Sequence, residues 1–117
     1  MDKFIIKGGK KLSGSITVNG AKNSALKILA ALILSEEKCA IKNFPFIEDT
    51  LVAVKILEKL GAKVQISKEE KTISIDPSSI NKTELDSLLV RRLRSSILFA
   101  GPMLAKFGKV KMYHPGG

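Results

Sequence analysis

The chain has 117 residues, of which 44% are hydrophobic and 26% are charged, the size and composition of one small globular domain with a single core. Its 20 basic residues exceed its 11 acids and give a formal net charge of +9, which favours anionic partners such as nucleic acid, anionic lipid or phosphorylated small molecules. No apolar run reaches the roughly 20 residues of a membrane span, and a single cysteine excludes an internal disulfide, so we expect a cytoplasmic protein without membrane insertion.

The first twenty residues predict two short strands. Phe4–Ile6 is an apolar run that Gly8-Gly9 ends, and Leu12–Asn19 alternates apolar with polar side chains. Asn19-Gly20 is by composition a hairpin signal. However, the residues after it have a helical period, so we expect a strand-to-helix turn there instead.

A helix is predicted from about Asn23 to Leu34, because apolar side chains recur at intervals of three and four residues. The motif Gly20-Ala21-Lys22-Asn23 stands at its start, where unpaired backbone N–H groups and the positive end of the helix dipole meet. Lys22 adds a cation, which makes this point a credible site for a phosphate or carboxylate. The alternative is that Asn23 only caps the helix and that Lys22 is solvated.

A third strand and a second helix follow. Cys39–Phe44 predicts a strand that Pro45 ends. Either Asp49 or Thr50 can cap the next helix, whose apolar side chains form one stripe, and Gly61 stands where a helix C-cap belongs.

Two alternating segments, Lys63–Ser67 and Thr72–Asp76, predict a hairpin. The order up to this point is therefore strand, helix, strand, helix, strand, strand. Ile80–Asp86 is a polar connection to the next element.

A third helix is predicted from about Leu88 to Lys106, with a kink at Gly101-Pro102, because proline removes a backbone donor and clashes with the preceding turn. Lys109–Tyr113 predicts a short last strand, and His114–Gly117 has the composition of a loop. This helix and strand look like the opening of a second unit similar to the first. We therefore expect the chain to be the N-terminal part of a larger protein.

The segment Arg91-Arg92-Leu93-Arg94 concentrates the three arginines of a lysine-rich chain. Arg91 and Arg94 are three residues apart and are expected to share a helix face, with Arg92 pointing elsewhere. The planar guanidinium suits a pyrophosphate or a carboxylate. A solvated basic face is the open alternative.

No set of catalytic nucleophiles or metal ligands is expected. His114 and Cys39 are the only histidine and cysteine and lie far apart in the sequence, so a Cys–His catalytic pair is not expected. Cys39 begins an apolar strand and is expected to be a buried, inert thiol. We expect no cofactor and no metal.

Several motifs in register resemble one family. They are Gly20–Leu26 before an apolar helix, Leu60–Val64, Leu93–Ile97, Gly101-Pro102, Phe107-Gly108 and Pro115-Gly116-Gly117. Together they look like the N-terminal part of the UDP-N-acetylglucosamine 1-carboxyvinyltransferases, which are enolpyruvyl transferases. The resemblance runs from Met1 to Gly117 without a large gap.

The resemblance implies a fold of the α/β (α+β) class, the inside-out α/β barrel of the enolpyruvyl transferases, with helices inside and sheets outside. Each of the family's two domains contains three copies of a strand-helix-strand-helix-strand-strand unit. This chain is expected to contain one complete unit and the start of a second. Residues 1–21 are expected to form strands that join the other, absent domain, and residues 22–117 to form a truncated first domain.

The resemblance also implies an activity, the transfer of the enolpyruvyl group of phosphoenolpyruvate to the 3-hydroxyl of UDP-N-acetylglucosamine with release of phosphate. This reaction belongs to peptidoglycan precursor synthesis, and so to cell-wall biogenesis, cell shape and cell division. Carried over residue by residue, Lys22 and Asn23 are expected to bind phosphoenolpyruvate and Arg94 to bind UDP-N-acetylglucosamine. The family's general-acid cysteine or aspartate lies on a loop beyond Gly117. No catalytic residue is therefore expected within the chain, which without the C-terminal part of the enzyme is expected to be inactive.

Three alternatives stay open. The sister enzyme, enolpyruvylshikimate-phosphate synthase, shares the fold, but its motif has Asp-Lys-Ser where this chain has Ala21-Lys22-Asn23. A small basic module for nucleic acid would explain the charge, although the pattern of basic residues interleaved with stacking aromatics that is usual for single-strand binding is missing. A non-catalytic remnant that pairs with another chain is the third.

Overall fold

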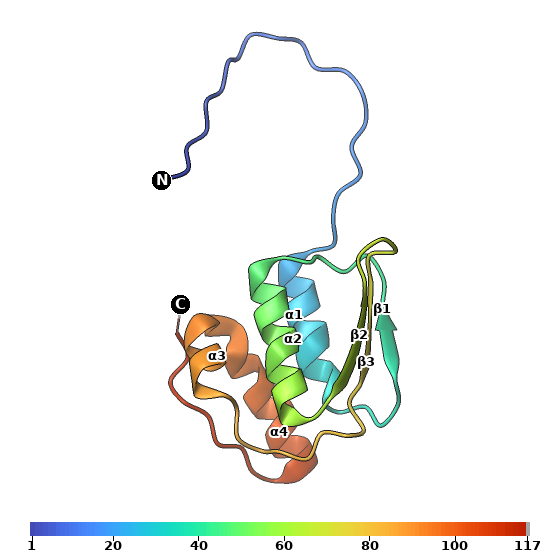
Figure 1. The fold of residues 1–117 in the computed structure, drawn as a ribbon, viewed down its shortest axis with the longest axis vertical. Helices are drawn as coiled ribbons and strands as arrows, with labels where there is room; N and C mark the ends of the chain where they lie inside the picture. Colours follow the sequence, from blue (N-terminus) through green and yellow to red (C-terminus); the bar gives the residue numbers. More distant parts are fainter. Residues whose placement is uncertain (117) are drawn as a thin grey trace.

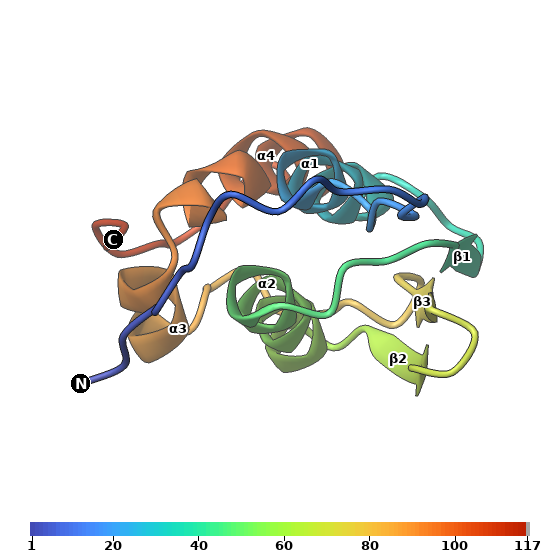
Figure 2. The ribbon, with the colours of Figure 1, turned by 90° about the horizontal axis from the view of Figure 1, so that it is seen from above.

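The structure is a computed structural model that describes residues 1–116. Two parallel helices, α1 (Lys22–Leu32) and α2 (Glu48–Leu60), lie side by side at its centre. A three-stranded sheet stands on one side of this pair and helix α3 (Ser87–Arg92) on the other (Figure 2). Residues 1–20 extend away from this body (Figure 1).

The sheet has the antiparallel order β1-β3-β2, formed by β1 (Cys39–Ile41), β2 (Lys63–Ser67) and β3 (Thr72–Asp76). The predicted hairpin is thus confirmed with its bounds. The strand predicted from residue 39 to 44 is shorter than expected. It ends at Ile41 because Asn43 adopts a φ of 52°, which turns the backbone out of the extended conformation.

The predicted helices form, but their caps differ from prediction. The N-cap of α1 is Ala21, so Asn23 lies inside the first turn and does not cap the helix. The N-cap of α2 is Ile47, and neither Asp49 nor Thr50 takes that position. Thr50 Oγ1 instead accepts a hydrogen bond from the Ile47 N–H at 3.2 Å. The predicted C-cap of α2 is confirmed, since Gly61 has a φ of 117° that side chains disfavour.

The two strands predicted within residues 1–20 do not form: across these described residues the structure has no helix or strand. Phe4 is 95% exposed and Ile16 is 92% exposed. A strand is stable only when a neighbour pairs with its backbone, and here these residues have none. That residues 1–21 join the sheet of another domain therefore stays a prediction.

The third helix differs most from expectation. It consists of α3, a 3₁₀ helix η1 (Arg94–Phe99) and α4 (Ala100–Phe107). The break lies at Leu93, whose φ of −136° and ψ of 105° are extended, so the kink predicted at Gly101-Pro102 is wrong. Pro102 lies in the first turn of α4, where its missing N–H has no partner to lose.

The last predicted strand, Lys109–Tyr113, is reduced to one parallel bridge between Glu84 and Lys111. The Lys111 N–H donates to the Thr83 carbonyl at 2.8 Å, and no longer ladder forms within the described residues. The chain then returns to α3, where the Gly116 N–H donates to the Val90 carbonyl at 3.1 Å. Gly117, the last residue of the predicted loop, lies outside the described residues.

One core holds all of these elements together. Its largest fully buried side chains come mostly from α1, α2, β3, η1 and α4, and include Leu29, Ile56, Ile75, Phe99 and Met103. Because η1 packs on the same core as α1, residues near position 94 are fixed beside the start of α1. Among the described helices, none is long and apolar enough to cross a membrane.

Candidate anion-binding site

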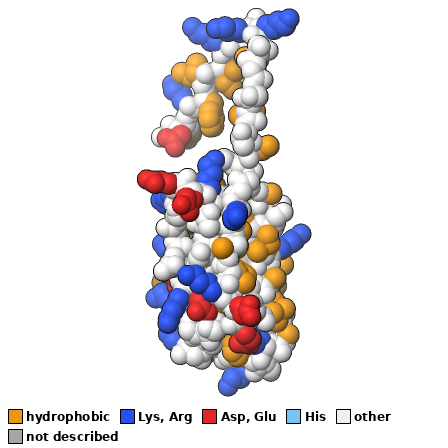
Figure 3. Space-filling view, turned by 90° about the vertical axis from the view of Figure 1, so that its right-hand side faces the viewer, with side chains coloured by type: hydrophobic (Ala, Val, Ile, Leu, Met, Phe, Trp, Pro, Cys, Tyr) orange, Lys and Arg blue, Asp and Glu red, His pale blue; other side chains and the backbone are white. Residues whose placement is uncertain are grey.

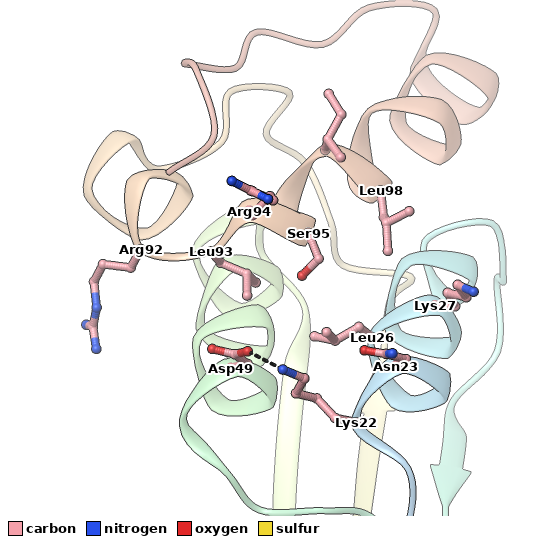
Figure 4. A pocket seen from close by; sticks show the side chains of 11 residues that line it. Lys22, Asn23, Leu26, Lys27, Asp49, Arg92, Leu93, Arg94, Ser95 and Leu98 are labelled. Atoms are coloured by element: carbon pink, nitrogen blue, oxygen red, sulfur yellow. Dashed lines mark hydrogen bonds and ion pairs between the residues drawn. The ribbon is translucent and has the colours of Figure 1, made fainter. Parts of the chain in front are cut away.

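A pocket of about 470 Å³ opens where the start of α1, the start of α2 and the break between α3 and η1 meet. Figure 4 shows that its lining side chains come from these three elements, with Arg92 pointing away from Lys22 and Asp49. The pocket is lined by Lys22, Asn23, Leu26, Lys27, Asp49, Arg92, Leu93, Arg94, Ser95, Ile97 and Leu98. All three residues predicted to bind substrate, Lys22, Asn23 and Arg94, therefore line the same pocket. Tertiary packing brings together residues that are far apart in the sequence.

The start of α1 is positioned by Gly20. A Cβ at this position would collide with the backbone carbonyl of Asn43 and crowd Pro45, so only glycine permits this close approach. The helix then begins at Lys22, with the Ala25 N–H donating to the Ala21 carbonyl at 3.0 Å. The N–H groups of the first turn have no partner within the helix, and such groups can bind an anion.

Lys22 forms an ion pair across the pocket with Asp49, which lies in the first turn of α2. The Lys22 Nζ and the Asp49 Oδ2 are 3.1 Å apart, and the two side chains are 47% and 41% exposed. Figure 4 shows the two side chains pointing toward each other. Because the pair is half exposed, it stabilises the fold by at most about 1 kcal/mol.

Arg92 makes the second ion pair at this place, with Glu48 of α2 at 3.1 Å. Because the helix breaks at Leu93, Arg92 and Arg94 line the pocket, whereas Arg91 is not among its lining residues. The prediction that Arg91 and Arg94 share a helix face is therefore wrong, and Arg92 is a site residue that it missed. The prediction failed because the backbone is extended at Leu93. The spacing of the arginines along the sequence gives no indication of this break.

Most of the charged residues that line the pocket are cations. Four cations line it, Lys22, Lys27, Arg92 and Arg94, and among the described lining residues Asp49 is the only acid. The adjoining Ser95 has a buried Oγ, the one buried side-chain oxygen or nitrogen without a hydrogen-bond partner in the described part of the chain. This arrangement can bind a ligand that carries several negative charges and hydrogen-bond acceptors.

Arg94 also borders a second hollow of about 440 Å³, together with Ile97 and the returning segment His114–Gly116. The His114 ring Nδ1 lies 3.0 Å from the Pro115 carbonyl oxygen, and this histidine is exposed. Cys39 lies in β1 and is partly buried rather than fully buried. In residues 1–116, no three His, Cys, Asp or Glu side chains are grouped so that they could hold a metal ion.

Known proteins are similar to this chain in sequence and in fold. The family model described as EPSP synthase (3-phosphoshikimate 1-carboxyvinyltransferase) matches residues 6–117. A relative from Clostridium tetani named UDP-N-acetylglucosamine 1-carboxyvinyltransferase 2 is 45% identical over 100% of this chain and 28% of its own length. A relative from Clostridium acetobutylicum named UDP-N-acetylglucosamine 1-carboxyvinyltransferase 1 is also 45% identical, with the same coverage.

A solved structure gives the same result for the fold. The enolpyruvyl transferase NikO from Streptomyces tendae superposes with a TM-score of 0.77 and 29% sequence identity, over 86% of this chain and 23% of that protein. The predicted α/β fold class is thus confirmed. The chain spans 28% of the length of the two clostridial relatives.

Proposed function

The chain belongs to the EPSP synthase (3-phosphoshikimate 1-carboxyvinyltransferase) family, and we propose that it forms part of the active site of a UDP-N-acetylglucosamine 1-carboxyvinyltransferase. In this reaction the enolpyruvyl group of phosphoenolpyruvate passes to the 3-hydroxyl of UDP-N-acetylglucosamine, and phosphate is released. The proposal includes a cytoplasmic location and a role in peptidoglycan precursor synthesis.

One observation carries the proposal: Lys22, Asn23 and Arg94 line one cationic pocket at the start of α1. Both proposed substrates carry several negative charges, so a pocket with four cations suits them. Lys22 and the free N–H groups of α1 would hold the phosphate or carboxylate of phosphoenolpyruvate, with Asn23 beside them. The guanidinium of Arg94 would contact the diphosphate of the nucleotide sugar through paired hydrogen bonds.

The same residues can contribute to the chemistry by electrostatics. Phosphate leaves phosphoenolpyruvate during the transfer, and a fixed ammonium such as Lys22 stabilises the charge that this group carries. A general acid and the remaining substrate contacts would come from residues that the relatives have beyond the region matched here. We therefore propose that residues 1–117 alone bind both substrates weakly and release no phosphate from them.

The sister reaction on shikimate 3-phosphate is the second candidate, because the family model takes its description from that enzyme. Two observations favour the UDP-sugar instead. The clostridial relatives that match the whole chain are named for UDP-N-acetylglucosamine, and Ala21 and Asn23 differ from the Asp and Ser of the sister motif.

Nucleic acid is a weaker candidate. On the face shown in Figure 3, lysine and arginine side chains are spread over the whole length of the molecule and interrupted by acids, rather than gathered into one strip. An extended strip of cations is what a phosphate backbone requires. Among the charged residues that line the pocket, four cations stand against one acid.

Calorimetric titration of residues 1–117 tests the proposal. UDP-N-acetylglucosamine is expected to bind and shikimate 3-phosphate not to bind at the same concentration. Lys22→Met is expected to weaken phosphoenolpyruvate binding about tenfold or more, since a hydrogen bond to a charged group contributes roughly 1.5–3 kcal/mol. Arg94→Met is expected to weaken binding of the UDP-sugar in the same way. Equal binding of shikimate 3-phosphate, or binding of an oligonucleotide that falls steeply with salt, would favour the other candidates.

A further inference from the structure

Asp49 is an unexpected member of the pocket. Every other charged residue that lines this pocket is a lysine or an arginine, and an acid repels the anionic substrates proposed above. Its carboxylate is only partly buried and lies 3.1 Å from the Lys22 ammonium. A single acid inside a site for anions therefore needs a physical reason.

The positions of the two residues in their helices suggest that reason. Lys22 is the first residue of α1, where the helix dipole disfavours a cation, and Asp49 lies in the first turn of α2, where the dipole favours an acid. Helices α1 and α2 pack against each other, and their N-terminal ends lie side by side (Figure 1). The ion pair thus connects two positive helix ends, with the Lys22 side chain extending from α1 toward α2 (Figure 4).

We propose that Asp49 is a positioning residue for Lys22, holding its ammonium at the pocket so that it meets the anion of the ligand. An ammonium has three donors, and the hydrogen bond to Asp49 Oδ2 uses one of them, so two stay available. The lysine side chain is long and flexible and loses much rotamer freedom when a ligand fixes it. A partner that fixes it beforehand lowers that cost. This inference rests on the proposed function.

The inference is testable because two possible roles of Asp49, positioning Lys22 and repelling the anion, predict opposite changes in anion affinity when its charge is removed. If Asp49 acts only through its charge, Asp49→Asn removes a repulsion and tightens anion binding. If Asp49 positions Lys22, the same substitution frees the ammonium and weakens binding, although the pocket becomes more positive. The sign of the change in affinity therefore separates the two.

The experiment is a titration of the 117-residue chain with phosphoenolpyruvate, followed by amide NMR, which also shows whether each variant is folded. Asp49→Asn is expected to raise the Kd about two- to fivefold, the range of an exposed ion pair, and Asp49→Glu to restore part of the loss. The matched control is Glu58→Gln, the same charge change on α2 at an exposed residue outside this pocket. Its Kd is expected to stay at the wild-type value.

A double-mutant cycle isolates the pair. In a Lys22→Met background, Asp49→Asn is expected to weaken binding no further, because the group that Asp49 positions is gone. The inference would be overturned if Asp49→Asn bound phosphoenolpyruvate more tightly than the wild type. It would also be overturned if this substitution lowered the affinity equally with and without Lys22. Either result would leave the proposed function intact. A wild-type chain that binds no phosphoenolpyruvate would contradict the proposed function itself, and the inference with it.

Discussion

The same kind of side chain has opposite surroundings in two regions of this molecule. In the folded body, residues 22–116, Ile73 and Ile75 alternate with polar residues along β3 and are both 0% exposed. In the N-terminal segment, residues 1–20, Ile16 also stands in an alternating pattern but is 92% exposed. The difference is that β3 lies between two paired strands, whereas residues 1–20 have no partner. An alternating sequence therefore specifies which face a strand would bury, and tertiary structure decides whether a strand forms.

The largest expected effect is on the free energy of unfolding, when one isoleucine from each region is replaced by alanine. Ile75→Ala should lower the free energy of unfolding by about 2–5 kcal/mol, because it leaves a cavity among fully buried side chains. Ile16→Ala should change it by less than about 0.5 kcal/mol, since this side chain has no contacts to lose. Urea denaturation of both variants measures the difference. If the two variants lost similar amounts of unfolding free energy, residues 1–20 would be shown to pack on the body in solution.

Alanine substitutions at two glycines, one at the start of the body and one in the N-terminal segment, test where the boundary between the two regions lies. Gly20→Ala should destabilise the chain by about 1–3 kcal/mol, the cost of overpacking, because the new methyl group collides with the Asn43 carbonyl. Gly8→Ala is the control, since nothing lies within 4 Å of the position that its Cβ would take. Thermal unfolding of the two variants should differ clearly. If Gly20→Ala unfolds like the wild type, the close approach at the start of α1 is contradicted.

The smallest expected effect is a pH dependence within the body. The Ser78 hydroxyl and N–H both donate to Asp76 Oδ1, and these bonds hold the pKa of that carboxyl below its usual value of 3.8. A group with a lowered pKa in the folded state adds stability above its unfolded pKa, and this is lost as the pH falls through the folded pKa. The midpoint of thermal unfolding should therefore fall less between pH 6 and pH 2.5 in Ser78→Ala than in the wild type. Ser13→Ala, in the N-terminal segment, should behave like the wild type.

Much of the body could be predicted from sequence because its signals are local. The period of three and four residues gave α1 and α2, and strict alternation gave the hairpin of β2 and β3. The break at Leu93 could not be predicted, since Pro102 was the stronger local signal and yet fits the first turn of α4. Leu93 adopts an extended backbone within a segment that has an uninterrupted helical pattern.

The candidate site was predicted in part. The motif at the start of α1 indicated Lys22 and Asn23, and the arginine cluster, together with the family resemblance, indicated Arg94. The structure places the three in one pocket, while their contacts with substrates stay a prediction. Arg92 and Asp49 were missed, because pairing between separate helices depends on tertiary packing and no spacing along the chain encodes it.

The most direct test of the central claim, that this pocket binds the anionic substrates, is amide chemical-shift mapping of the 117-residue chain. Phosphoenolpyruvate and UDP-N-acetylglucosamine would be added separately and together. The largest shifts are expected at Lys22 and Asn23 for the first ligand and around Arg94 for the second, with residues 1–16 unaffected. Shifts confined to the N-terminal segment or to the sheet, with none around the pocket, would contradict the account.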